Sequence, residues 1–348
     1  MLLGLSVDGA GLDPGAWAAA RGRDVDDYPG TQLVDVASNA EREGFTFLHL
    51  PDTFAAQHEH GRLQRRLDAL LAAARVGPIT SSIGLVAEVT TTHTEPFHVA
   101  KNVATLDFVS SGRAGWQPSV SRTQDEARLF GRKDAAPLDD LVAEASEFVD
   151  VVRRLCDSWE DDAVIRDRPT GRYVDRTKLH TVDFEGRFFS VRGPSITPRS
   201  PQGQPIVLVD ATDDAFVDLA ARQADLVLVD TDDPAFAGSR REDLRRRAAA
   251  AGRDPSEVRV LAVEHLREPA SVIAERCEAW WRTAVVDGFL VRVSPRAQGI
   301  DPRATHLARD LKARGVLTPT LAGATFRDHL GLERPPNRYA PDLREAAR

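Results

Sequence analysis

Two kinds of segment alternate along the chain. Short apolar runs rich in Val, Leu and Ile are followed by longer segments with apolar residues at helical spacing, a pattern that predicts parallel strands joined by crossover helices. The predicted strands cover residues 2–7, 45–50, 82–89, 114–120, 205–210, 225–230, 258–263 and 288–293. The predicted helices cover residues 31–43, 61–76, 96–109, 138–156, 213–223, 240–251, 269–286 and 303–315.

Eight consecutive strand–helix pairs favour a closed (β/α)8 TIM barrel over an open sheet, and we expect residues 1–348 to form a single domain of this kind. Segment 160–204 has no place in that count, so we expect an excursion outside the barrel between strands four and five. Within it, VDFEGRFFSVRG has two alternating runs around a Glu-Gly turn and predicts an antiparallel hairpin. Residues 324–348 predict an extended, Pro-rich tail that packs on the barrel or on a neighbouring subunit.

The composition is that of an ordinary globular protein, with 42% hydrophobic and 28% charged residues in a chain of 348. No apolar run approaches the length of a membrane span, and no basic region precedes the first apolar stretch, so we expect a cytoplasmic protein. The net charge of −8 disfavours nucleic acid and anionic membranes as partners. Cys156 and Cys277 lie in separate predicted helices, where we expect buried thiols rather than a disulfide.

A TIM barrel places its active site at the carboxyl ends of its strands. Asp52 follows the second predicted strand, where its position suits either a functional group or a turn cap before Thr53. The third strand ends in three threonines, Thr90–Thr92, whose hydroxyls suit a polar cofactor ring but also suit helix capping. His93 follows them and is a candidate catalytic acid or base, because an imidazole titrates near neutral pH.

Other chemistry finds less support in the sequence. Glu88 lies in a strand expected to be buried on both faces, so its carboxyl group must be paired or protonated. The spacing of His49, His58 and His60 matches no standard zinc pattern; we interpret this stretch as a solvated loop and expect no metal site. No nucleophile elbow, P-loop or dinucleotide fingerprint follows a predicted strand. The remaining side chains at the predicted strand ends include no recognisable nucleophile or metal site, which favours chemistry carried out by a bound cofactor.

Three long segments carry a specific resemblance. They are residues 91–116 (TTHTEPFHVAKNVATLDFVSSGRAGW), 156–207 and 324–340. Across nearly its whole length the chain resembles the bacterial-luciferase-like flavin monooxygenases, in particular the branch of nitrilotriacetate monooxygenase component A and the dibenzothiophene-sulfone monooxygenases. This resemblance implies a TIM barrel, reduced FMN supplied by a separate flavin reductase, O2 as co-substrate, a small organic substrate, and a homodimer or tetramer.

The resemblance also implies roles for particular positions. Asp52 and Thr91 match the residues that lie near the isoalloxazine ring. The family pattern Gly-Arg-Ala-Gly-Trp-Asn reads GRAGWQ here, so Gln117 takes the place of the asparagine, with an amide one methylene longer. Thr212 is the remaining hydroxyl that can face the cofactor phosphate in the turn after the fifth strand.

That turn departs from the family pattern, which has Ala-Gly-X-Ser followed shortly by Gly. The sequence here is DATDDAF, and it carries three aspartates. A carboxylate about 4 Å from a phosphate charge costs roughly 4 kcal/mol at an effective dielectric constant of about 20. FMN binding therefore requires either that Asp213 and Asp214 turn outward or that Arg122 and Arg240 supply compensating charge.

Two alternatives to an FMN-dependent monooxygenase consequently stay open. One is a flavin-free barrel that serves as a partner subunit or ligand-binding protein. The other is an oxidoreductase of the same superfamily that uses the deazaflavin F420, whose phosphate sits farther along a longer tail. The turn is the feature that separates the first of these from the monooxygenase.

Overall fold

Eight parallel strands close into a barrel in the computed structural model, which describes residues 1–7, 29–55, 58–59, 62–63, 67–293, 300–317 and 323–340. Around the barrel the strands follow the order β1-β14-β13-β12-β11-β6-β5-β2, with β2 pairing back to β1. The strands are β1 (Leu2–Val7), β2 (Phe47–Leu50), β5 (Gly84–Thr90), β6 (Ala114–Ser119), β11 (Ile206–Asp210), β12 (Leu226–Val229), β13 (Arg259–His265) and β14 (Gly288–Val293). The predicted (β/α)8 barrel is confirmed.

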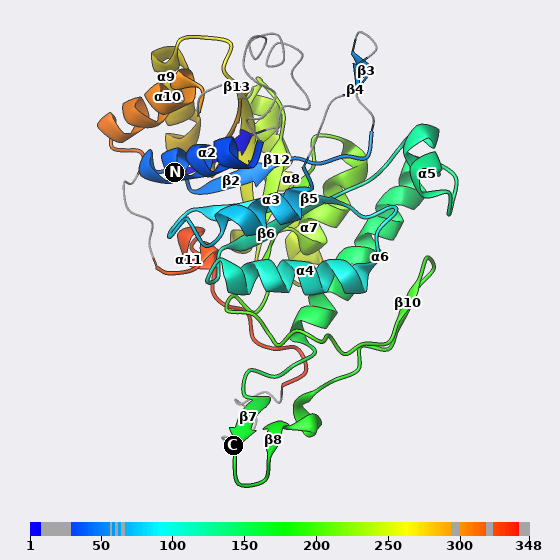
Figure 1. The fold of residues 1–348 in the computed structure, drawn as a ribbon. Helices are drawn as coiled ribbons and strands as arrows, with labels where there is room; N and C mark the ends of the chain where they lie inside the picture. Colours follow the sequence, from blue (N-terminus) through cyan, green and yellow to red (C-terminus); the bar gives the residue numbers. More distant parts are fainter. Residues whose placement is uncertain are drawn as a thin grey trace.

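Helices surround this barrel, as Figure 1 shows. They are α2 (Pro29–Arg42), α3 (Ala69–Val76), α4 (Pro96–Val109), α5 (Gln124–Phe130), α6 (Leu138–Asp157), α7 (Val217–Gln223), α8 (Pro234–Ala250), α9 (Ala270–Arg282) and α10 (Pro302–Ala313). Both α8 and α10 begin with an Asp-Pro pair, in which the carboxylate caps a backbone N–H and the proline occupies the first helical position. Among the described residues, none of the helices has the length and apolar character that crossing a bilayer requires.

Two predicted helices begin well away from their observed starts, and one short helix was not predicted. The helix expected over 61–76 begins only at Ala69, after its cap Asp68, because the preceding chain forms two short antiparallel strands, β3 (His58–Glu59) and β4 (Arg62–Leu63). The helix expected at 240–251 begins at Pro234, where the Asp-Pro signal was missed. The short helix α5 was not predicted; Thr123 and Glu126 form the capping box that starts it. His60 lies outside the described residues.

The excursion between β6 and β11 contains two small antiparallel pairs. The strands β9 (Phe184–Glu185) and β10 (Ser190–Val191) form the predicted hairpin, with Val191 opposite Phe184. A second pair, β7 (Val164–Asp167) and β8 (Arg172–Val174), was not predicted and projects away from the barrel at the bottom of Figure 1. A short 3-10 helix at Arg176–Lys178 follows β8.

The C-terminal tail packs on the barrel of this same chain. Its helix α11 (Phe326–His329) places the Phe326 ring 5.7 Å from the ring of Phe47 in β2, and Phe326 is fully buried. Arg327 is buried beside it, 5% exposed. Of the two arrangements that the sequence left open, packing on the barrel is therefore confirmed for the described part of the tail, and residues 341–348 lie outside that part.

The interior of the barrel changes character along its axis. An apolar cluster fills it from the end that α11 covers and includes Phe47, Val86, Ile206, Leu208, Leu226, Leu228, Leu261, Val263, Leu290 and Phe326. Toward the carboxyl ends of the strands, polar side chains replace these apolar ones. We call that end of the barrel the mouth.

Candidate active site

The first polar feature of the mouth is a buried imidazole. His49 lies in β2, 3% exposed, and its Nδ1 is 3.0 Å from Ser6 Oγ on the adjacent strand β1. His49 therefore lies in the strand predicted over 45–50, and the interpretation of the stretch from His49 onward as a solvated loop does not hold for this residue. Burial lowers its pKa to about 3, and the charge of Arg292 contributes to the shift. The imidazole is consequently neutral near pH 7 and acts as a hydrogen-bonding group.

Several buried polar atoms near the mouth have no hydrogen-bond partner in the described part of the chain, among them His93 Nδ1 and Ser121 Oγ. His49 Nε2 and Gln117 Oε1 make no hydrogen bond of acceptable geometry within the described part of the chain, although the two side chains lie close enough for Gln117 to raise the pKa of His49 against the effect of burial. Gln117 lies in β6 and is 8% exposed. A buried polar atom left unpaired costs about 1–3 kcal/mol, so such atoms mark places where a ligand or water satisfies them. The polar edge of an isoalloxazine ring carries both donors and acceptors, and these two atoms fit it chemically.

Four neighbouring strands carry an ionic network at the mouth. Arg292 of β14 donates to Asp230 at 2.8 Å and lies 3.6 Å from Asp210, which ends β11. His265 of β13 has its Nε2 3.1 Å from both carboxylate oxygens of Asp230. The sequence analysis missed Asp230, His265 and Arg292. The available signal was a charged or ionisable residue at the carboxyl end of an otherwise apolar strand.

Asp52 uses its carboxylate to hold two backbone segments together. Its Oδ1 accepts from Thr53 N at 2.8 Å, and its Oδ2 accepts from the N–H of Ala69, the first residue of α3, at 3.0 Å. The backbone N–H of Asp52 in turn donates to Glu88 Oε2 at 3.3 Å. This geometry agrees with the turn-capping interpretation and ties the loop after β2 to β5 and α3.

The threonines after β5 fasten that strand to β6. Thr91 donates to the carbonyl of Ser119 through both its backbone N–H (2.8 Å) and its hydroxyl (2.9 Å). Thr92 Oγ1 accepts from Ser121 N at 3.0 Å. The hydroxyl of Thr91 thus already has a backbone partner. The side chain is 1% exposed and forms part of the floor of the mouth.

His93 belongs to a small aromatic cluster. Its ring stacks on Phe130 of α5, with centroids 4.7 Å apart, and Phe54 contacts Phe130 edge-on at 4.7 Å. Burial lowers the pKa of His93, and the positive charge of Lys133 adds to this effect. The imidazole is therefore unprotonated at neutral pH, where it can accept a proton.

The aspartate-rich turn after β11 satisfies its own backbone. Asp210 Oδ1 accepts from Thr212 N at 3.0 Å, and Asp213 Oδ1 accepts from Ala215 N at 3.0 Å. The hydroxyl oxygen of Thr212 accepts from Asp230 N at 2.9 Å. Carboxylates of the turn therefore occupy two of the N–H groups that a bound anion would use.

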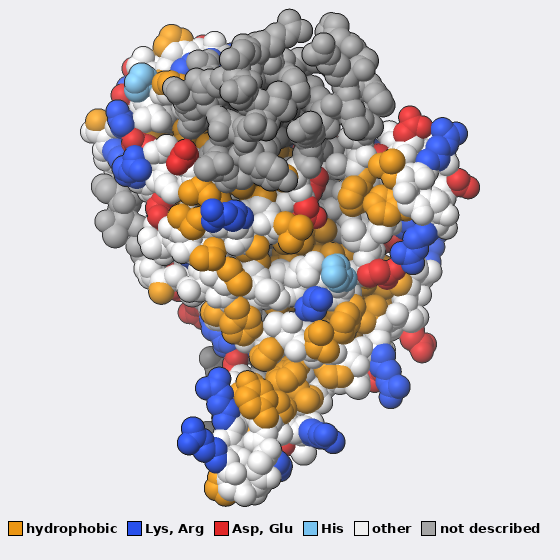
Figure 2. Space-filling model, viewed as in Figure 1, with side chains coloured by type: hydrophobic (Ala, Val, Ile, Leu, Met, Phe, Trp, Pro, Cys, Tyr) orange, Lys and Arg blue, Asp and Glu red, His pale blue; other side chains and the backbone are white. Residues whose placement is uncertain are grey.

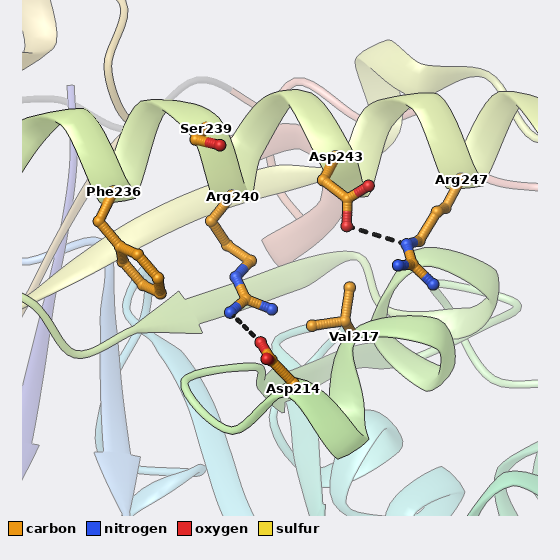
Figure 3. Close-up of a pocket in the computed structure, with 7 residues that line it drawn as sticks. All are labelled: Asp214, Val217, Phe236, Ser239, Arg240, Asp243 and Arg247. Atoms are coloured by element: carbon orange, nitrogen blue, oxygen red, sulfur yellow. Dashed lines mark hydrogen bonds and ion pairs between the residues drawn. The ribbon is translucent and has the colours of Figure 1, made fainter.

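Arginines from two other elements compensate the charge of this turn. Arg122, in the loop between β6 and α5, lies 3.5 Å from Asp213, and Arg240 of α8 forms an ion pair with Asp214 (Figure 3). The Arg240 side chain is only 8% exposed, whereas that of Asp214 is 90% exposed. The structure combines the two arrangements that the sequence left open: Arg122 and Arg240 supply compensating charge, and the Asp214 side chain also points into solvent.

A hollow of about 340 Å³ lies beside the turn, between α7 and α8 (Figure 3). Its lining residues are Asp214, Val217, Phe236, Ser239, Arg240, Asp243 and Arg247. Both arginines in this wall are paired, Arg240 with Asp214 and Arg247 with Asp243. The hollow therefore offers apolar surface and neutralised ion pairs. Within the described ranges, no cluster of three or more His, Cys, Asp or Glu side chains is arranged to hold a metal ion.

Comparison with known proteins decides the family. The model of the family described as luciferase-like monooxygenase matches residues 15–315, most of the chain. The chain belongs to the luciferase-like monooxygenase family. It is therefore an oxidoreductase, and the barrel mouth described above is where members of a TIM-barrel family carry out their chemistry.

Its relatives within the family are monooxygenases of small organic compounds. The chain is 34% identical to nitrilotriacetate monooxygenase component A of Aminobacter aminovorans, over 75% of this chain and 60% of that protein. It is 29% identical to the dibenzothiophene-sulfone monooxygenase of Rhodococcus erythropolis, over 94% of this chain and 77% of the relative. The solved structure of the EDTA monooxygenase from Chelativorans sp. BNC1 has the same fold, with a TM-score of 0.84, 21% identity, and coverage of 97% and 99% of the two chains.

Proposed function

We propose that this flavin-dependent monooxygenase takes reduced FMN from a separate flavin reductase and uses O2 to oxidise a small organic substrate at the barrel mouth. The observation that carries the proposal is the pair of unsatisfied atoms, His49 Nε2 and Gln117 Oε1. Both are buried, and both suit the polar edge of a flavin ring. When bound there, reduced flavin supplies the electrons with which O2 is activated.

In this proposal the residues of the mouth bind the flavin ring and fix the loops around it. His49 and Gln117 contact its polar edge. Thr91 and Asp52 act mainly by fixing the loops around it, since their polar atoms already bind backbone groups. Thr212 marks the tail end of the cofactor site. Side chains and loops held in place by such hydrogen bonds can orient a flavin ring without rearranging when it binds.

We assign His93 the role of a proton acceptor. Its lowered pKa keeps it unprotonated at neutral pH, and its stacking on Phe130 holds the ring in one orientation. Together with Phe54 it forms an apolar wall that limits the access of water to the mouth.

The proposal extends to the assembly. We propose one domain, located in the cytoplasm, that forms a homodimer or tetramer. Exposed apolar side chains support an assembly: Leu71 of α3 is 72% exposed, and Phe108 and Val109 of α4 are 44% and 40% exposed. Figure 2 shows hydrophobic side chains gathered over the face on which α3 and α4 lie in Figure 1. Light scattering of the purified chain tests this part.

Substitution of the two unsatisfied side chains tests the function. We expect His49→Ala and Gln117→Ala each to weaken flavin binding by about tenfold, because each removes one hydrogen bond to the ring. Gln124→Ala is the matched control, since Gln124 is exposed and its side chain bonds to Asp134 and Ala135, away from the proposed flavin contacts. Anaerobic fluorescence titration with reduced and oxidised FMN gives the dissociation constants.

The same titration, repeated with F420, distinguishes the proposed monooxygenase from the F420-dependent oxidoreductase and from the flavin-free partner subunit. Binding of FMN that is unchanged in both variants would contradict the proposed site. Binding of F420 in place of FMN would favour the deazaflavin-dependent oxidoreductase. If neither cofactor binds in either redox state, the flavin-free partner subunit takes the place of this proposal.

A further inference from the structure

Two arginines from different elements converge on one turn beside the barrel mouth. Arg122 comes from the loop after β6 and Arg240 from α8, and both guanidinium groups reach the turn at 210–216. Two unpaired guanidinium groups in this arrangement would form a receptor for a phosphate group. Here each is already paired with a carboxylate of the turn itself, Asp213 or Asp214.

We infer that the chain holds its flavin by the ring alone and that the phosphate adds no affinity, so that riboflavin binds at least as tightly as FMN. This inference rests on the proposed function, because it presupposes that the mouth binds a flavin. It concerns the other end of the cofactor, where the residues of this chain fit a phosphate poorly.

The hydrogen-bond donors of the turn support the inference. The N–H groups of Thr212 and Ala215 donate to the side chains of Asp210 and Asp213. The Thr212 hydroxyl oxygen already accepts from the backbone of Asp230. A phosphate arriving at this turn would have to displace carboxylates that are covalently tethered to it.

The charges around the turn also indicate that a phosphate group gains little affinity there. Arg122 and Arg240 balance Asp213 and Asp214, and Arg292 lies 3.6 Å from Asp210. A phosphate that bound either guanidinium group would replace one anion by another and leave a carboxylate unpaired, so the exchange brings little net attraction. A neutral ribityl tail meets no such exchange.

A pair of dissociation constants tests the inference on the unmodified protein. Fluorescence titration with riboflavin and with FMN is carried out at low and at high salt. We expect riboflavin to bind at least as tightly as FMN at both salt concentrations, because each guanidinium group that could attract the phosphate is already paired with a carboxylate. FMN that binds more than about threefold tighter than riboflavin would overturn the inference.

Neutralising both aspartates provides the second measurement. The double variant Asp213→Asn, Asp214→Asn keeps the size of both side chains and keeps an oxygen that accepts from Ala215 N, while it releases Arg122 and Arg240. We expect FMN to bind at least about tenfold tighter to this variant, with riboflavin unchanged within about twofold. The gain should diminish as salt rises. The matched control is Asp218→Asn, an exposed carboxylate on the adjoining helix α7 that pairs with Arg222.

The outcomes distinguish this inference from the proposed function. If FMN and riboflavin both bind but the double variant gains nothing for FMN, only the inference fails. If neither flavin binds to the unmodified chain, the proposed function fails and the inference fails with it. A gain of equal size for riboflavin would also overturn the inference, because it would show that the aspartates act on the ring rather than on the phosphate.

Discussion

At the scale of single residues, the protonation state of His49 links the site to stability. The pKa of this side chain is about 3 in the folded chain because burial penalises the imidazolium form, whereas a solvated histidine has a pKa near 6.5. The unfolded chain therefore takes up a proton below pH 6.5 that the folded chain refuses until about pH 3. The contribution of the neutral imidazole to stability is present above pH 6.5 and is lost as the pH falls through this window.

We accordingly expect His49 to reduce the free energy of unfolding by about 2 kcal/mol between pH 7 and pH 5. The variant His49→Gln keeps a polar side chain beside Ser6 but cannot titrate, so its stability should fall by about 2 kcal/mol less over the same range. Urea unfolding at the two pH values measures the difference. Equal losses in both proteins would show that His49 is not buried in the neutral form.

The sequence identifies some residues of the mouth and not others for a physical reason. Asp52 and Thr91 directly follow apolar runs, so their place at a strand end can be predicted from the local pattern. His49 and Arg292 lie within their strands, and whether they meet depends on the barrel register that sets Ser6 beside both of them. A local pattern does not determine that register.

At the scale of elements, the tail helix α11 acts as a plug for the end of the barrel opposite the mouth. Phe326 fills the space against Phe47, while Arg327 donates to Asp225 at 3.2 Å. Burial alone would raise the pKa of Asp225, but Arg327 and Arg153 hold it at about 2. The helix α11 thus closes this end of the barrel with an apolar contact from Phe326 and an ion pair from Arg327.

We expect Phe326→Ala to lower the free energy of unfolding by about 3–5 kcal/mol, the usual cost of removing a fully buried aromatic ring. Tyr173→Ala is the control, because Tyr173 is 60% exposed and should be nearly neutral. Thermal unfolding of the two variants beside the unmodified chain measures the effect. A melting temperature of Phe326→Ala that equals that of the control would contradict the role of α11 as a plug.

Element prediction succeeds here where the signal is local and fails where it is not. All eight barrel strands coincide with segments predicted from the hydrophobic pattern, and α4 begins at its Glu-Pro pair as expected. The helix predicted from residue 61 begins only at Ala69, after the short pair β3 and β4, and α5 is too short for its periodicity to be detected. These short elements border the mouth, where tertiary contacts rather than propensity decide the local structure.

At the scale of the whole molecule, the chain has the TIM barrel of the luciferase-like monooxygenase family, and its mouth carries an aspartate-rich turn. The fold and the class of reaction could be anticipated from the order of elements and the long collinear resemblance. The partner of each aspartate in the turn could not, because Arg122 and Arg240 reach it from elements that are distant in sequence. The proposed discrimination at the cofactor tail therefore depends on contacts that form only in the assembled barrel.

The central claim is that the barrel mouth binds reduced flavin and controls its reaction with O2. Stopped-flow mixing of reduced FMN or riboflavin with aerated buffer, with and without equimolar protein, follows the return of oxidised-flavin absorbance and tests this claim most directly. We expect the chain to change the rate at which the flavin is reoxidised, and we expect His49→Ala and Gln117→Ala to return that rate toward the value for free flavin. Identical reoxidation of both flavins with and without the protein would contradict it.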